Sequence, residues 1–336
     1  MPAATLHVTF VELLADADVP RAIAHAISSH LRHARLGAML YDVPFYSNVV
    51  LMAIRYGLKR PAEVRPLGTL IHHGGEAAGL YANLLARLHR ATKVPADARL
   101  ALMAGAASHI ALDAAQHDLV RFIARRQMAA TGKGDESFHH RIAEKFHSLF
   151  FHLETFGEDI IGTPRWRERT RLTEGASLIF RRHEPAVTAA WLAALRDTYG
   201  FAPTVTEWTS QLRAFVRFGA MTSIYPARRN SRLYSTAEKR RTFYSNDLFH
   251  FPDHMDAATR LAVRTLVLSL DYYEAGRFDA ESRGKFIAEL ALPARISVPE
   301  AADAPNPYPV PPLPDRYRAA ATAAAGGRTR APRPAR

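Results

Sequence analysis

Two strings of histidine and carboxylate residues are the part of this sequence best suited to chemistry. The first is Ser108-His109-Ile-Ala-Leu-Asp113-Ala-Ala-Gln-His117, in which His109, Asp113 and His117 follow one another at intervals of four. At about 3.6 residues per helical turn, such residues drift by only about 80° and project from one side of a helix. Their neighbours are mostly alanine, leucine and isoleucine, so these ionisable groups should lie in an interior setting. They are costly there unless they are paired or bound to metal.

The second string, His140-Arg-Ile-Ala-Glu144-Lys-Phe-His147, places three such residues on one face of the next helix. Neighbouring helices that each present histidine and carboxylate are how bundle interiors build multinuclear metal sites. The chain has no cysteine, so imidazole and carboxylate must hold any transition metal. That donor set suits zinc, manganese or iron, and hydrolytic chemistry favours zinc. A single histidine is more often a satisfied core residue; the pairing of two strings favours ligation.

At these residues the chain resembles the zinc-dependent phospholipase C family, whose fold is all-helical. That family shows an early histidine, a Leu-Gly-Ala…Asp segment, a His-led helix, a Ser-His-x3-Asp-x3-His string and a His-x3-Glu pair. The corresponding residues, in the same order, are His7, Leu36 to Asp42, the His72-His73 doublet, Ser108 to His117, and His140 with Glu144. The resemblance covers about residues 5–160.

The resemblance implies a phosphoesterase with up to three zinc ions. It assigns one ion to Asp42, a histidine of the 72/73 doublet, His109 and Asp113, and a second to His117, His140 and Glu144. Asp113 would bridge toward a third ion held with His7. Closely spaced metal ions lower the pKa of bound water and neutralise phosphate oxygens. Asp42 could also orient or deprotonate that water.

Some features depart from the family pattern. Secreted members complete the third site with the amino group of their processed N-terminus, whereas only six residues precede His7 here. We therefore expect two zinc ions. His72 is preferred to His73 as the ligand, and His147, or His152 with Glu154, is an alternative to His140 with Glu144.

Two other classes of function explain part of the pattern. The adjacent pair His117-Asp118 is the signature of the HD-type metal phosphohydrolases, with His72 and Asp159 in the remaining ligand positions. That reading leaves His109 and Asp113 unexplained, so it ranks second. The third class is a non-catalytic helical protein that keeps a structural metal site.

Helices must position these residues, and the apolar spacing predicts an all-α protein. Two helices, over 69–90 and 95–130, have the clearest pattern. Further helices are expected over 8–14, 22–33, 49–56, 138–161, 172–180, 186–199, 205–216 and 257–273. We divide the chain into a phospholipase C-like metal-binding region (1–163), additional helices packed on it (164–298), and a disordered basic tail (299–336) rich in proline, alanine and arginine. This tail should add nothing to the core.

The net charge of +12 favours anionic partners. We expect a phosphodiester or phospholipid substrate and no specific nucleic acid. The basic run Arg228–Arg241 is interpreted as a solvated face, with peripheral contact to an anionic membrane surface as the alternative. No run of 18 apolar residues and no signal peptide is visible, so we expect a cytoplasmic protein.

Overall fold

The computed structural model describes residues 3–46, 66–74, 76–157, 185–224, 236–292, 306–314 and 317. In this part of the chain the regular structure is helical apart from one short hairpin, so the all-α prediction is confirmed. The α-helices are α1 (Ala3–Leu13), α2 (Arg21–Ser29), α3 (Leu31–Met39), α5 (Pro66–Thr69), α6 (Ala77–Arg90), α7 (Ala96–Thr131), α8 (Glu136–Phe156), α11 (Pro185–Tyr199), α12 (Val205–Ile224), α14 (Ala237–Phe243), α15 (Phe251–Ala275) and α16 (Ala280–Leu290). The remaining elements are the 3-10 helices η1 (Leu14–Asp16) and η2 (Val43–Tyr46), the π-helix η3 (Leu70–Gly74), and the strands β1 (Ser245–Asn246) and β2 (Phe249–His250).

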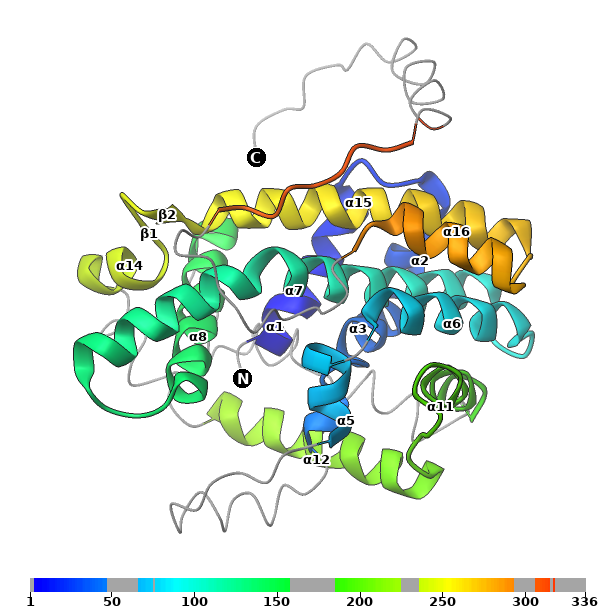
Figure 1. The fold of residues 1–336 in the computed structure, drawn as a ribbon, viewed down its shortest axis with the longest axis horizontal. Coiled ribbons are helices and arrows are strands. Elements are labelled where there is room, and N and C mark those ends of the chain that lie inside the picture. Colours follow the sequence, from blue (N-terminus) through cyan, green and yellow to red (C-terminus); the bar gives the residue numbers. More distant parts are fainter. Residues whose placement is uncertain are drawn as a thin grey trace.

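Helix α7 runs through the centre of the molecule, with α15 beside it (Figure 1). It begins after Pro95, carries Asp97 in its first turn, and ends at Gly132, which has a φ of 60°. These signals match the predicted range because proline and glycine are preferred at those ends. Between Ala98 and Ala124 it is buried on most of its circumference. Its many alanines therefore let α1, α2, α3, α6, α8 and α15 all pack against it.

Helices α3 and α7 touch through their backbones. A Cβ atom added to Gly105 would lie 2.0 Å from the carbonyl oxygen of Ala34, and one added to Gly37 would lie 2.3 Å from that of Leu102. Only glycine allows such an approach. The crossing brings the C-terminal end of α3, and the turn to Asp42 that follows it, against the middle of α7.

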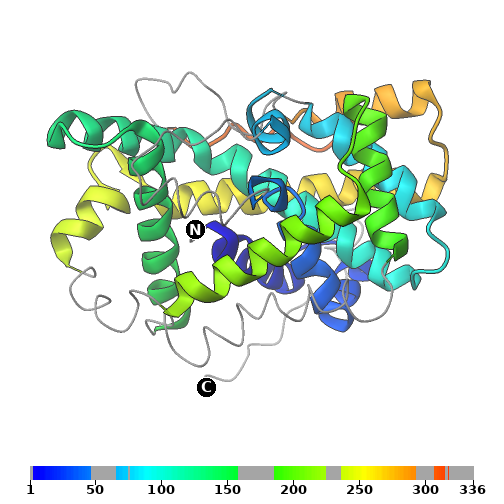
Figure 2. The ribbon, with the colours of Figure 1, turned by 90° about the horizontal axis from the view of Figure 1, so that it is seen from below.

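The later helices share the core of the earlier ones. Trp191 of α11, Trp208 of α12 and Leu261 of α15 belong to the same cluster of buried residues as Leu102 of α7. Helix α11 packs on α6, and α12 crosses the lower face of the molecule next to η2 (Figure 2). The boundary predicted at 163/164 lies outside the described residues, and the division into regions stays a prediction. In the described part, no helix has the length and apolar character needed to span a bilayer.

Several helices differ from their predicted ranges. The helix expected over 22–33 is divided at His30, whose backbone is not helical, and α16, α14 and the hairpin were not predicted. In the range 69–90, where one helix was expected, the structure has the π-helix η3 up to Gly74 and the helix α6 from Ala77, which follows its N-cap residue Glu76. Helix α8 ends at Gly157, which has a φ of 65°, rather than at 161. The helices expected over 49–56 and 172–180 lie outside the described residues.

The expectation of a disordered tail from 299 is wrong for residues 306–314 and 317, which run along α15 (Figure 1). Four apolar side chains in this segment pack against the core: Tyr308, Val310, Leu313 and Tyr317. The Tyr317 hydroxyl donates to Asp271 at 2.6 Å, and the Arg264 guanidinium donates to the Pro312 carbonyl at 3.3 Å. The high proline content of this segment predicted disorder. An extended, proline-rich segment can nevertheless bury an apolar side chain every few residues.

Removal of residues 306–336 should therefore lower the melting temperature, on the order of 5 °C, because partly buried tyrosine and leucine side chains are lost. The same measurement on a chain that lacks only 318–336 provides the control. Equal melting temperatures for the full chain and the chain that lacks 306–336 would show that the contacts along α15 contribute nothing to stability.

Substitution Gly105→Ala should destabilise the protein by at least about 2 kcal/mol, because the added methyl group must push α3 away from α7. Gly284→Ala in α16 is the matched control: nothing lies within 4 Å of its added Cβ, so helix propensity should stabilise it by about 0.5–1 kcal/mol. Chemical denaturation of both variants measures the difference. A Gly105→Ala variant as stable as wild type would contradict the close crossing.

Candidate metal centre

The structure brings all eight residues predicted as metal ligands into three groups. Within each group the nitrogen and oxygen atoms that could bind a metal lie within 4.8 Å of one another. The groups are His7 with His109 and Asp113, Asp42 with His72 and His109, and His117 with His140 and Glu144. They come from α1, the turn after α3, η3, α7 and α8, so five separate segments of the chain meet here.

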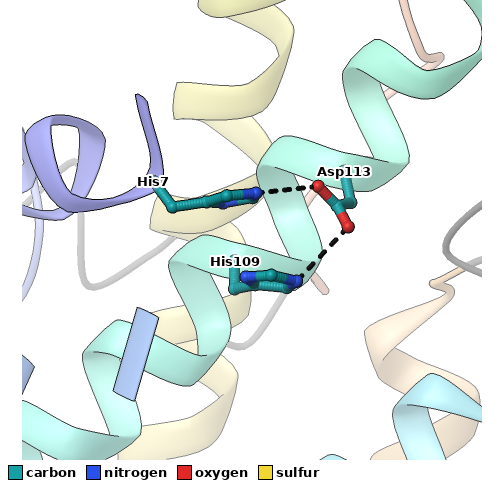
Figure 3. Close-up of side chains that lie close together, drawn as sticks. All are labelled: His7, His109 and Asp113. Carbon is teal, nitrogen blue, oxygen red and sulfur yellow. Dashed lines mark ion pairs between the residues drawn. The ribbon is translucent and has the colours of Figure 1, made fainter. Parts of the chain in front are cut away.

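The Asp113 carboxylate lies at the centre of these groups. Its Oδ1 atom is 3.0 Å from His7 Nε2 and 3.5 Å from His117 Nε2. Its Oδ2 atom is 3.3 Å from His109 Nε2 and 3.7 Å from His72 Nε2. Figure 3 shows how His7 of α1 and His109 of α7 approach the two oxygens of this one side chain. Asp113 therefore touches imidazoles that belong to all three groups.

Two of the histidines are held in a fixed orientation by backbone carbonyls. His109 Nδ1 donates to Ala38 O at 2.7 Å, and His72 Nδ1 donates to Gly68 O at 2.9 Å. In a neutral ring the proton is then on Nδ1, and Nε2 carries the lone pair. These two Nε2 atoms lie only 3.4 Å apart. Outer hydrogen bonds of this kind orient imidazole ligands in metal sites.

The local backbone makes both hydrogen bonds possible. Ala38 lies in the last turn of α3, where carbonyls lack helical partners, and the crossing at Gly105 brings it within reach of His109. His72 lies in the π-helix η3; single π-turns are frequent at functional sites. The ring of His109 also stacks with the His7 ring, at a centroid distance of 4.0 Å, and with the Tyr41 ring, at 5.1 Å. Packing therefore fixes the plane of His109.

The third group joins α7 to α8. His140 Nε2 lies 3.2 Å from Glu144 Oε1, one turn along α8, and His117 Nε2 lies 3.9 Å from the same oxygen. The two imidazole rings meet at 73°. Helix α8 is started by Asp135, whose side chain accepts a hydrogen bond from the Phe138 backbone N–H, as preferred at a helix N-cap.

Burial and mutual charge shift the pKa values of these groups in opposite directions. Burial lowers the pKa of His109, but Asp113 and Asp42 outweigh it and raise the value to about 9. At His117 burial dominates, and the pKa falls to about 4. Burial raises the pKa of Asp113, yet the imidazoles around it, including the protonated His109 that hydrogen-bonds to it, hold the value well below its usual range. At neutral pH and without a metal ion, Asp113 is therefore a carboxylate, His109 is protonated and His117 is a neutral imidazole.

A hollow of about the size of one water molecule lies between the groups. It is bounded by α1, α7 and α8, and its walls are Leu6, His7, Leu112, Asp113, Gln116, His117 and Glu144. Its two leucines are almost completely buried. The polar side of the hollow thus carries members of two different groups, His7 with Asp113 and His117 with Glu144.

The alternative ligands lie elsewhere. His147 packs against the Phe251 ring at 4.3 Å, and His152 is hydrogen-bonded to Thr9 at 2.8 Å. Glu154 accepts a hydrogen bond from the Tyr244 hydroxyl at 2.6 Å and pairs with Arg240. The sequence placed His147 on the same face as Glu144, but tertiary packing turns it into the aromatic core beside α15.

The residues of the HD-type alternative are not brought together in the described part of the chain. Asp118 joins none of the three groups, and His72 lies with Asp42 and His109 instead. Asp159, the His73 side chain and most of the basic run around Arg228 lie outside the described residues.

Three features of the site were not predicted from the sequence. They are the Ala38 carbonyl, the Gly68 carbonyl and the stacking of Tyr41 on His109. Backbone acceptors leave no residue-type signal. Tyr41 is the exception, because it directly precedes Asp42.

The side chains present fit a divalent metal. The donors are imidazole nitrogens and carboxylate oxygens, they are buried or nearly so, and two of the imidazoles already have outer hydrogen-bond partners. Without a metal ion, the proton on His109 offsets part of the charge of the Asp42 and Asp113 carboxylates, and a bound cation would take over that role. A zinc or similar ion is the natural partner of such a set.

Comparison with known proteins adds no relative. A scan against models of protein families finds no match, and searches of curated proteins and of solved structures find none either. The resemblance to the zinc-dependent phospholipase C family therefore rests on the residues quoted above and stays a prediction from the sequence.

A strong chelator should lower the melting temperature of the purified protein, and added zinc should restore it, because the ligands come from several helices. Zinc at about a hundred times its Kd should add about 2.7 kcal/mol of stability. Thermal unfolding with and without chelator measures this. The melting temperature of the double variant His117→Ala/Glu144→Ala should change less on addition of the chelator. A wild-type melting temperature that the chelator leaves unchanged would contradict the metal site.

Proposed function

We propose that this protein is a zinc-dependent phosphoesterase that resembles phospholipase C and hydrolyses a phosphodiester. The observation that supports it most is the approach of the Nε2 atoms of His72 and His109 to 3.4 Å, with both Nδ1 protons committed to backbone carbonyls. Once both rings are neutral, as metal binding requires, such an arrangement would orient two Nε2 lone pairs toward one point. A structure that needed these histidines only for packing would have no reason to fix both rings in this way.

The ligand assignment follows the groups. Asp42, His72, His109 and Asp113 would hold one ion, and His117, His140 and Glu144 a second, with His7 beside Asp113. Bound zinc ions supply Lewis acidity, lower the pKa of water and offset the charge of phosphate oxygens. Asp113, which contacts residues of all three groups, would set the spacing between the two ions.

Asp42 is the residue of this set that the resemblance assigns to proton transfer. Its side chain is 16% exposed, as is that of Glu144 and against 6% for Asp113, and it is the one carboxylate of the set that lies in a turn rather than in a helix. Its carboxylate would take a proton from the attacking water as the water oxygen bonds to phosphorus. The phosphorus–oxygen ester bond breaks in the same displacement, and the departing alkoxide takes a proton from solvent. Water is consumed, and an alcohol and a phosphate monoester result.

The substrate class follows from the resemblance and the charge. A basic chain with paired metal sites suits an anionic phosphodiester, and a phospholipid is the form that the resemblance favours. Peripheral contact with an anionic membrane and a cytoplasmic location stay predictions from the sequence. The non-catalytic alternative needs only one structural metal, and three groups around a shared carboxylate exceed that need.

Paired variants of two neighbouring aspartates test this function. Asp113→Asn keeps the size of the side chain but removes the charge shared by the groups. It should therefore reduce zinc content and lower phosphodiester turnover at least about a hundredfold while the helical circular dichroism survives. Asp118→Asn should cost little, because Asp118 belongs to no group.

Zinc content by elemental analysis and hydrolysis of a panel of phospholipids, other phosphodiesters and nucleotides give the readouts. An HD-type enzyme would show the reverse order, with Asp118→Asn inactive and Asp113→Asn active. Zinc-dependent melting with no turnover on any member of the panel would favour the non-catalytic protein.

A further inference from the structure

The hydrogen bond between Thr9 and His152 connects two helices that carry different metal groups. Both side chains are almost completely buried, with 1% and 0% of their surfaces exposed. His152 Nδ1 donates to the Ser148 carbonyl one turn back in α8, so its Nε2 must accept. The Thr9 hydroxyl, 2.8 Å away, is the donor.

This bond completes a set of three links among α1, α7 and α8, which all pack against one another (Figures 1 and 2). His7 links α1 to Asp113 of α7, and His117 of α7 approaches Glu144 of α8. Both of those links are made by residues of the metal groups. The link from α8 back to α1 is made by Thr9 and His152, which belong to no group.

The two faces of α1 have different partners. Residues 7 and 9 project about 200° apart on a helix, so His7 meets α7 while Thr9 meets α8. A shift of α1 that relieves one contact therefore strains the other. Because His7 and His117 both contact Asp113 Oδ1, movement of α1 relative to α8 also changes the geometry on both sides of this carboxylate.

We propose that the Thr9–His152 hydrogen bond is a positioning device that couples metal occupancy at the Asp113 groups to occupancy at the His117, His140 and Glu144 group. The inference rests on the metal binding in the proposed function, but not on the phosphodiester reaction. It assigns to His152 a role different from the ligand role considered from the sequence. Coupling of this kind between two sites typically amounts to about tenfold in affinity.

The experiment is a chelator titration of the zinc-loaded protein, with zinc remaining on the protein as the readout. The wild type should release its ions together in one transition. Thr9→Val has nearly the same shape but cannot donate, so it should release them in two transitions, the first at about tenfold weaker affinity. Thr9→Ser keeps the hydroxyl and should restore the single transition.

Two further variants separate positioning from stability. Thr265→Val removes a buried hydroxyl that has no hydrogen-bond partner among the described residues, and it should leave zinc release unchanged. Thr9→Val/His152→Leu replaces both partners by apolar groups, which often costs little stability. It keeps the experiment informative if Thr9→Val alone fails to fold, and it should also release zinc in two steps.

The outcomes are distinct. A single transition in Thr9→Val or in the double variant would overturn the coupling, even if the metal-free melting temperature falls. Two transitions in the wild type would also overturn it. Coupled zinc release without turnover on any phosphodiester would keep this inference and reject the proposed function, whereas a wild type that binds no zinc would reject both.

Discussion

The cost of burying the Asp113 carboxylate is the constraint on which the rest of this structure depends. The side chain is 6% exposed and sits in the middle of α7, which is buried on most of its circumference between Ala98 and Ala124. A charge in that setting needs compensation, and every nearby segment contributes to it. Helix α1 brings His7, η3 brings His72, and α7 itself supplies His109 and His117. The packing of three elements is thus organised around one ionised group.

The same constraint explains why the helices near the centre are so closely spaced. Imidazoles reach Asp113 from α1 and η3 only if these elements lie against α7, and the small residues of α7 allow this. Gly105 and Gly37 remove the side chains that would keep α3 away. The Ala38 carbonyl then reaches His109, and the turn after α3 carries Asp42 to within 3.6 Å of His72. The absence of side chains at the crossing of α3 and α7 therefore controls where the Ala38 carbonyl and the Asp42 carboxylate lie.

Local spacing made part of the site predictable. His109, Asp113 and His117 could be placed on one side of a helix because helical geometry depends only on neighbouring residues. The same argument selected His140 and Glu144 from the spacing of the second string, whereas His7, Asp42 and His72 were selected through the resemblance, which also supplied the long-range pairings. His147 was placed on the same face as Glu144 but turned into the aromatic core, since a periodic pattern does not say which neighbour a face will meet. The contacts of Tyr308, Val310, Leu313 and Tyr317 were missed because average composition hides a few spaced apolar residues.

The continuity of α7 has a consequence for how this chain tolerates changes in length. One uninterrupted helix carries members of all three groups, spaced over two turns. Deletion of one residue between His109 and Asp113 would rotate the flanking halves by about 100° relative to each other. Ligands on opposite sides of the deletion could then no longer face the same centre. A deletion in the loop between α7 and α8 leaves the angular positions of the ligands around α7 unchanged, because a flexible connection can absorb the lost residue. Insertions and deletions should therefore be tolerated between the helices but not in the stretch of α7 from His109 to His117.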